Sequence, residues 1–171
     1  MTPIITIDDL RLKKDVAKTT DTDKINPIIL QAQDVDLRDY LGMHFYFDVL
    51  SNLETPSYQD LLSGSTFMQN GVQFAQDGLK SMLIDLTYSR LMLEINVNIT
   101  PFGATTKLTV DSEPTSQAAL KDKAQQNRES AASKWEIIKL YLDDNKQLFP
   151  HYNYKADTIR TGERKLKFWR I

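Results

Sequence analysis

The sequence predicts a mainly α-helical fold: a small helical bundle with a long C-terminal helix, a short β-hairpin and extended arms. Apolar residues recur at helical spacing over much of the chain. Two β-prone runs flank the dipeptide Asn70-Gly71, and residues 97–114 are β-prone and interrupted by turn residues. With 171 residues, of which 41% are hydrophobic and 26% charged, the chain has enough apolar material to fold around one core.

The N-terminal part is expected to hold two helices. A short one begins at Thr6, whose side chain can cap the first turn. A longer one runs over about residues 23–41, and Gly42 stands where a left-handed residue commonly follows a helix. Gln33, Asp34, Asp36 and Arg38 are expected to lie largely off the apolar stripe of this helix, and the two aspartates are expected to be solvated. The stripe comprises Ile25, Ile28, Ile29, Ala32, Val35 and Tyr40.

A shorter helix, rich in aromatic residues, is expected over residues 43–53. A proline ends it, and residues 57–62 add one more turn. Residues 77–96 are the most hydrophobic segment, and apolar residues fall on nearly every side of the helix that they predict. Such a helix belongs at the centre of a bundle. Arg90 and Glu94 lie four residues apart on its remaining strip, where they can form an ion pair.

The segment of about residues 66–75 predicts a β-hairpin. Its Asn-Gly dipeptide is the strongest short signal for a two-residue turn, and such a turn places Phe67 opposite Phe74 on one face. An isolated two-stranded hairpin is marginally stable in water, so this one is expected to lean on another surface. Phe67, Asn70, Gly71 and Phe74 are therefore candidate protein-interface residues.

Residues 97–114 are interpreted as an extended, ordered arm. Their β-prone runs and turn residues argue against a helix. Long connections without a helix or sheet of their own are usually functional or disordered, and the composition here favours order. The candidate interface residues of this segment are Ile99, Phe102, Leu108 and Val110.

The longest helix is expected over about residues 116–147. Its first half is polar and helix-prone, whereas its second half carries apolar side chains that can dock on the core. The chain is thus divided into a helical domain over residues 1–150 and a basic C-terminal arm over residues 151–171. The side chains expected to dock are Ala131, Trp135, Ile138, Tyr141, Leu142 and Leu148.

The C-terminal arm carries a net charge of +4, whereas the remainder of the chain carries −6. Its last residues alternate basic and apolar side chains, as a strand does. We interpret it as a docking arm that adds a strand to the sheet edge of a partner protein. Packing on its own domain, nucleic-acid binding and a frayed terminus are the alternatives. The candidate interface residues are Arg160, Arg164, Lys165, Lys167, Phe168, Trp169 and Arg170.

The sequence contains no catalytic or cofactor-binding motif. Cysteine is absent, and the chain has two histidines and six glycines, which excludes thiolate sites and glycine-rich phosphate loops. His44 and His151 are far apart in sequence, and adjacent acids such as Asp143 and Asp144 point to different sides of a helix. We expect no enzyme activity, no cofactor and no metal site. No apolar run is long enough to span a membrane.

Several short motifs follow one another along the chain in an order that resembles a known family. They are Ile5-Thr6-Ile7-Asp8-Asp9-Leu10, Gln31-Ala32-Gln33-Asp34, Leu41-Gly42, Tyr58-Gln59-Asp60-Leu61-Leu62-Ser63-Gly64, Leu86-Thr87-Tyr88-Ser89-Arg90, Asn98-Ile99-Thr100-Pro101-Phe102-Gly103 and Ser112-Glu113-Pro114. Their order, together with the hairpin and the long last helix, resembles the head–tail connector (adaptor) ring proteins of tailed bacteriophages. The form found in crAss-like and related phages is the most similar. The resemblance covers roughly residues 4–150 and rests on the order of the motifs, each of which is short.

This resemblance implies a structural virion protein that forms a homo-oligomeric ring, commonly of twelve copies, beneath the portal protein. Such a ring lies in the neck of the virion, joins capsid to tail and extends the channel through which DNA passes without specific binding. It is assembled in the host cytoplasm. By the same resemblance, the hairpin and residues 97–114 are inter-subunit elements, and the C-terminal arm reaches an adjacent neck or tail ring.

Three other functions remain as alternatives. A different neck or tail-completion protein, such as a tail terminator, is expected to be richer in β-structure. A cytosolic helical regulator that binds nucleic acid needs a basic recognition helix, and the helix over residues 23–41 has more acids than bases. An enzyme needs a catalytic constellation, which the sequence does not offer.

Overall fold

The computed structural model confirms the predicted class, a mainly helical chain with a long C-terminal helix and a small antiparallel hairpin. The structure describes residues 2–17, 22–94, 97–100, 103–106 and 116–152, the two stretches between 97 and 106 as backbone. The elements are α1 (Ile7–Lys13), α2 (Thr22–Gln31), the π-helix η1 (Ala32–Leu37), α3 (Arg38–Leu41), α4 (Met43–Ser51), α5 (Pro56–Ser63), β1 (Ser65–Gln69), β2 (Val72–Gln76), α6 (Gly78–Glu94), β3 (Val97–Thr100), β4 (Gly103–Thr106) and α7 (Gln117–Asp144).

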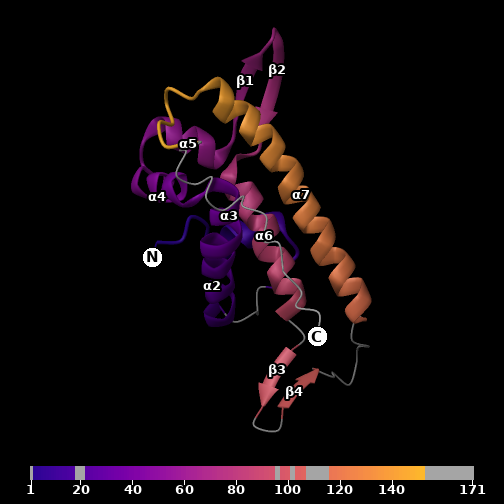
Figure 1. Ribbon diagram of the computed structural model, residues 1–171. Helices are drawn as coiled ribbons and strands as arrows, with labels where there is room; N and C mark the ends of the chain where they lie inside the picture. Colours follow the sequence, from indigo (N-terminus) through magenta and orange to yellow (C-terminus); the bar gives the residue numbers. More distant parts are fainter. Residues whose placement is uncertain (1, 18–21, 95–96, 101–102, 107–115, 153–171) are drawn as a thin grey trace, which may run out of the picture.

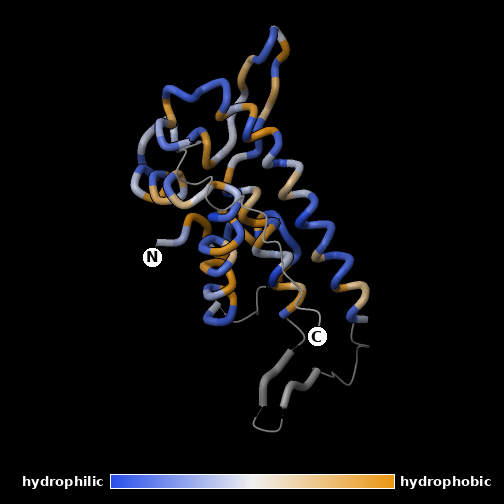
Figure 2. Tube along the Cα trace, in the orientation of Figure 1, coloured by the Kyte–Doolittle hydropathy of each residue, from blue (hydrophilic) through white to orange (hydrophobic). Residues whose placement is uncertain are grey.

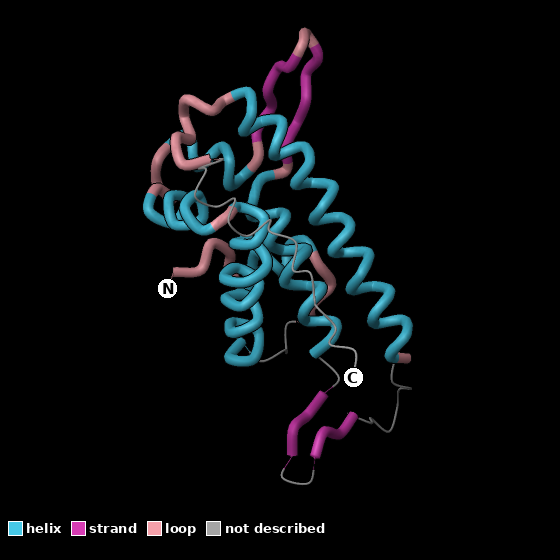
Figure 3. Tube along the Cα trace, in the orientation of Figure 1, coloured by secondary structure: helices cyan, strands magenta, loops and turns pink. Residues whose placement is uncertain are grey.

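The molecule is elongated, and its long direction is set by α6 and α7, which lie side by side and run in opposite directions (Figure 1). Most of the shorter helices pack against α6, and Tyr40 of α3 also contacts Trp135 of α7. The strands are confined to two hairpins that project from opposite ends of this helical body (Figure 3). The β1–β2 hairpin joins the packed core only at its base, through Phe67.

The central position of α6 is confirmed. Twelve of its residues are buried, on nearly all sides of the helix, and it contacts α1, α2, η1, α5 and α7. By contrast, α7 is hydrophilic over much of its length (Figure 2). Its buried side chains are Ala124, Asn127, Ala131, Trp135, Ile138, Tyr141 and Leu142.

Two helix starts follow from local side-chain hydrogen bonds. The Thr6 hydroxyl accepts a hydrogen bond from the Asp9 amide at 3.2 Å, and the Asp9 carboxylate accepts one from the Thr6 amide at 2.7 Å. This reciprocal pair is a capping box and confirms the predicted cap. At α7 the Ser116 hydroxyl accepts a hydrogen bond from the amide of Ala119, without a reciprocal bond.

The helix predicted over residues 23–41 is interrupted by the π-helix η1, and this changes which side chains are buried. A π-helix has more residues per turn than an α-helix, so it rotates the positions that follow it. Gln33 is fully buried and Val35 is 40% exposed, so both assignments made from an uninterrupted α-helix are wrong. Gln33 binds the N-terminal segment, accepting from the Ile4 amide at 2.7 Å and donating to the Thr2 carbonyl at 3.2 Å.

Instead of the ion pair expected between Arg90 and Glu94, Arg90 pairs with Asp36, a residue of another helix. The Arg90 guanidinium donates to both carboxylate oxygens of Asp36 in η1, at 2.5 and 2.8 Å. Asp36 is therefore not a solvated surface acid as expected, and its neighbour Asp34 accepts a hydrogen bond from the Tyr46 hydroxyl. A bidentate pair of this kind fixes orientation better than an exposed pair along one helix.

The β1–β2 hairpin has the predicted turn and register. Phe67 pairs with Phe74 and Gln69 with Val72. Asn70 and Gly71 have φ values of 52° and 79°, the positive pair that a type I′ turn requires.

The predicted extended arm over residues 97–114 is wrong for its first part, which folds back on itself. Strands β3 and β4 pair as a second antiparallel hairpin, with Val97 opposite Thr106 and Thr100 opposite Gly103. The short stretch between the strands holds turn-forming residues, so adjacent backbone groups can pair with each other. Residues 107–114 lie outside the described part of the chain.

The end of α7 is fixed by Phe149, which is 1% exposed, whereas Leu148 is 48% exposed. The expected docking of Leu148 is therefore wrong. The ring of Phe149 lies 5.2 Å from that of Tyr58 and 6.1 Å from that of Phe45. These edge-on contacts attach the chain after α7 to α4 and α5.

Replacing Gly78 with alanine is expected to destabilise the protein strongly. Gly78 has a φ of 83°, and an added Cβ would lie 2.4 Å from the Leu62 carbonyl oxygen. The backbone strain alone costs about 1–3 kcal/mol, and the clash adds to it. Urea unfolding followed by circular dichroism measures the loss.

The matched control is Gly71→Ala, where φ is also positive but no atom lies within 4 Å of the added Cβ. It should lose only the strain energy. Equal losses for the two variants would contradict the close approach of α5 and α6 at Gly78.

Candidate protein-interaction site

The β1–β2 hairpin projects beyond one end of the helical body (Figure 1). Residues 65–76 contain no charged side chain, although 26% of all residues are charged. Met68 is 58% exposed and Val72 is 56% exposed, both close to the turn. An uncharged projection that presents large apolar side chains to solvent is typical of a surface that another protein covers.

The base of the hairpin is held against α7 by aromatic packing. Phe67, 8% exposed, stacks on Phe74 with ring centroids 5.7 Å apart. The edge of the Tyr141 ring packs against Phe67 at 5.5 Å. The hairpin therefore leans on the core as predicted, with one face covered at its base and the tip free.

Gln76 fixes the direction in which the hairpin leaves the body. Its side-chain amide donates to the Asp60 carbonyl at 2.7 Å and to the Ser65 hydroxyl at 3.1 Å. Its side-chain oxygen accepts from the Gly78 amide at 2.7 Å. Because Gln76 is 3% exposed, these bonds are shielded from water and tie the hairpin to the ends of α5 and α6.

The structure brings Phe67, Asn70, Gly71 and Phe74 together in this hairpin. The exposed apolar surface, however, comes from Met68 and Val72, which the sequence analysis did not single out. Strand alternation is the signal for Met68: if Phe67 faces the core, the next residue faces outward.

The other predicted interface residues are only partly described. The backbone of Ile99 lies in β3, opposite Ala104. The remaining candidates lie outside the described residues: Phe102, Leu108, Val110, Arg160, Arg164, Lys165, Lys167, Phe168, Trp169 and Arg170.

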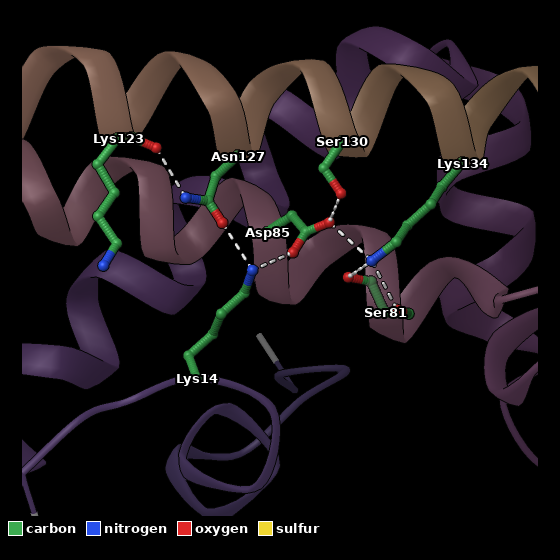
Figure 4. A network of polar contacts seen from close by, with 7 residues as sticks. All are labelled: Lys14, Ser81, Asp85, Lys123, Asn127, Ser130 and Lys134. Carbon is green, nitrogen blue, oxygen red and sulfur yellow. Dashed lines mark hydrogen bonds and ion pairs between the residues drawn. The ribbon is translucent and has the colours of Figure 1, made fainter.

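A buried carboxylate lies between the helices that carry the hairpins (Figure 4). Asp85 of α6 is 2% exposed. Its two oxygens meet the ammonium groups of Lys14 at 2.6 Å and Lys134 at 2.7 Å, and the Ser130 hydroxyl donates to it at 2.7 Å. One acid thereby joins the segment after α1 to both long helices.

Further hydrogen bonds hold the two lysines in place. Lys14 also donates to the Asn127 side-chain oxygen at 2.6 Å, and the Asn127 amide donates to the Lys123 carbonyl at 2.7 Å. Lys134 donates to the Ser81 hydroxyl at 2.9 Å. The sequence analysis missed this cluster, although an aspartate between apolar residues, as Asp85 is between Ile84 and Leu86, is a signal for a buried partner.

Asp85 is held in its charged form. Burial on its own would raise the pKa of the carboxyl group, but hydrogen bonds from Lys134, Lys14 and Ser130 outweigh that effect, so the pKa lies below its usual value. With its oxygens engaged by three donors, the group is suited to hold helices together rather than to transfer protons.

A shallow pocket of about 170 Å³ opens between α1, α5 and α6. Its lining includes two acids and two lysines, and Leu12 at its rim is 82% exposed. Within the described residues, no group of three or more His, Cys, Asp or Glu side chains is arranged to hold a metal ion.

No helix in the described part of the chain combines the length and the apolar character that crossing a membrane requires.

Comparison with known proteins gives one family. A family model described as a family of unknown function (DUF6712) matches residues 37–162, which include the hairpin, Asp85 and all of α7. No curated protein and no solved structure matches the chain.

The variant Asp85→Asn is expected to lower the free energy of unfolding by about 3 kcal/mol, because it leaves two lysines facing each other without their anion. Denaturant unfolding measures the change. Asp143→Asn is the control, since Asp143 pairs with Lys146 at 3.1 Å on the surface, with side chains 45% and 62% exposed. That change should cost under about 1 kcal/mol. Similar losses for both variants would contradict the role of Asp85.

The lowered pKa of Asp85 predicts how stability depends on pH. A carboxyl group whose pKa is lower in the folded state binds fewer protons there, so it stabilises the fold above its unfolded pKa of about 4. That contribution should be lost as the pH falls below about 4 towards the folded pKa. Unfolding midpoints of the unmodified protein and Asp85→Asn should converge over this range. Curves that stay parallel down to pH 3 would contradict the assignment.

Proposed function

The chain belongs to the DUF6712 family of unknown function, and we propose that it is a non-catalytic structural subunit of a head–tail connector ring in a tailed bacteriophage. In this role it forms a homo-oligomeric ring, commonly of twelve copies, in the neck of the virion. Its partners are the portal protein above it and adjacent neck or tail rings. It is assembled in the host cytoplasm, and DNA passes through the ring without specific binding.

The observation that carries the proposal is the uncharged, projecting β1–β2 hairpin. Soluble proteins usually protect the free edges of a sheet with lysines, prolines or bulges, because unpaired backbone groups recruit other strands. Residues 65–76 include none of the charged residues or prolines that would do this. A hairpin whose strand edges lack this protection is suited to be covered permanently by neighbouring subunits.

The placement of the hairpins also supports a ring. Rings that assemble head to tail need two different complementary surfaces on each subunit. The β1–β2 and β3–β4 hairpins project from opposite ends of the α6–α7 pair (Figure 1). Each copy therefore offers two different projections, one at each end of a stiff helical body.

The way in which the base of the β1–β2 hairpin is held in place also favours assembly. Phe67 and Gln76 hold β1 and β2 against the core through the contacts described above. A projection that is already ordered loses less conformational entropy when a partner covers it. The subunit is thus prepared for binding before it meets its neighbour.

The helical content and charge pattern disfavour two of the alternatives. A tail terminator is expected to be rich in β-structure, whereas the described chain is mainly helical. A nucleic-acid regulator needs a basic helix, whereas α7 carries five basic and five acidic residues.

The test is whether the purified full chain forms closed rings. Native mass spectrometry and particle images should give a symmetric ring with an open centre. The double variant Met68→Gln/Val72→Thr should raise the concentration needed for assembly at least tenfold, which corresponds to about 1.4 kcal/mol per interface. Val35→Thr, a change at an exposed apolar residue of η1, is the control and should assemble as the unmodified chain does.

A chain that stays monomeric at every concentration would overturn the proposed function. An unaltered ring in the Met68→Gln/Val72→Thr variant would show that the hairpin tip is not the contact.

A further inference from the structure

Each of the two hairpins leaves its outer strand edges unpaired within the described chain. Strands β1 and β2 form one two-stranded sheet, and β3 and β4 form another. In an antiparallel pair, alternate residues of each strand direct their backbone N–H and C=O groups away from the partner strand. Both hairpins therefore carry backbone hydrogen-bonding groups that a further strand can satisfy.

The β3–β4 hairpin shares the missing edge protection of the β1–β2 hairpin. Residues 97–106 contain no charged residue, and their one proline, Pro101, stands between the strands rather than in them. A two-stranded sheet that packs on nothing else is marginally stable in water, whereas three or more strands with a hydrophobic face are stable. Joining the two hairpins into one four-stranded sheet would pair unprotected edges and raise the number of strands at the same time.

We infer that the β1–β2 hairpin of one copy pairs, edge to edge, with the β3–β4 hairpin of a second copy to form a four-stranded sheet between subunits. The inference rests on the proposed function, since it specifies the contact between neighbours in the ring. Because neither hairpin carries a charge, their edges meet without electrostatic repulsion.

The pairing has to occur between two copies because the two hairpins of one copy are too far apart. They are separated along the chain by α6, whose 17 residues span about 25 Å at 1.5 Å per residue. The five-residue strands of the β1–β2 hairpin reach about 17 Å, and the two hairpins point away from each other (Figure 3). One copy thus presents one hairpin at each end, and pairing propagates from copy to copy.

A complementation experiment tests the pairing. Lysines placed on both strands of one hairpin act as edge protection. The first variant, Thr66→Lys/Gln73→Lys, blocks the β1–β2 hairpin at two exposed positions. The second, Thr100→Lys/Thr105→Lys, blocks the β3–β4 hairpin at two diagonal positions, one on each strand. The control, Gln126→Lys/Gln147→Lys, adds the same charge at exposed residues in and just after α7. Circular dichroism establishes that each variant keeps the helical signal of the unmodified chain.

Each blocked variant alone should be monomeric in native mass spectra, and the control should assemble as the unmodified chain does. A mixture of the two blocked variants should form a one-to-one dimer and stop there. In that dimer, the intact β1–β2 hairpin of the second variant pairs with the intact β3–β4 hairpin of the first. A contact in which only one of the two hairpins takes part does not predict this pattern of two monomers that combine into a dimer.

The contrary outcomes separate this inference from the proposed function. If the unmodified chain forms rings but the mixed variants stay monomeric, the pairing is wrong and the ring stands. If either blocked variant assembles normally, its hairpin is not part of the contact, and the inference is again overturned. Should the unmodified chain itself never assemble, both the inference and the proposed function fail.

Discussion

The ion cluster around Asp85 is the interaction on which the geometry of the whole molecule depends. A carboxylate that is 2% exposed is tolerated within a hydrophobic helix only because cations and a hydroxyl meet it there. Those partners come from the segment after α1 and from α7, so a single residue holds three parts of the chain in register (Figure 4). Since α6 follows β2 and α7 packs along it, this cluster holds together the two long helices from whose ends the hairpins project.

Around this cluster, the molecule separates a rigid interior from surfaces that remain incomplete. Most charged residues of the described chain lie on the helices, where they cover the surface of the body. The two hairpins, in contrast, are free of charge and expose backbone edges. In the proposed ring, the same contrast gives each part its role: the core packs within one copy, and the two-stranded sheets are completed by neighbouring copies.

Features set by neighbouring residues were predictable from the sequence. The cap at Thr6 and the turn at Asn70-Gly71 depend on contacts within three residues, so local patterns contain the whole signal. The central position of the helix over residues 78–94 followed from apolar residues on all its sides. The ion pairs that the sequence analysis predicted wrongly or missed join segments that are distant in the chain. Arg90 pairs with a residue 54 positions away and Lys134 with one 49 positions away.

The π-helix illustrates the same limit at the level of the backbone. A change in the residues per turn, centred on Ala32–Leu37, exchanges the buried and exposed positions of Gln33 and Val35. A periodicity read from the sequence assumes a constant number of residues per turn, so it cannot show where that number changes. The hairpin site was predicted in place and register, but its exposed residues were not, because their exposure depends on how Tyr141 covers one face.

Hydrogen–deuterium exchange of the hairpin amides, compared between dilute monomer and assembled material, tests most directly whether the hairpins are completed by neighbours. Coverage by another strand should slow exchange at residues 65–76 and 97–106 on assembly, while the amides of α6 change little because they are already bonded within one copy. Hairpin amides that exchange equally in monomer and assembly would contradict this account.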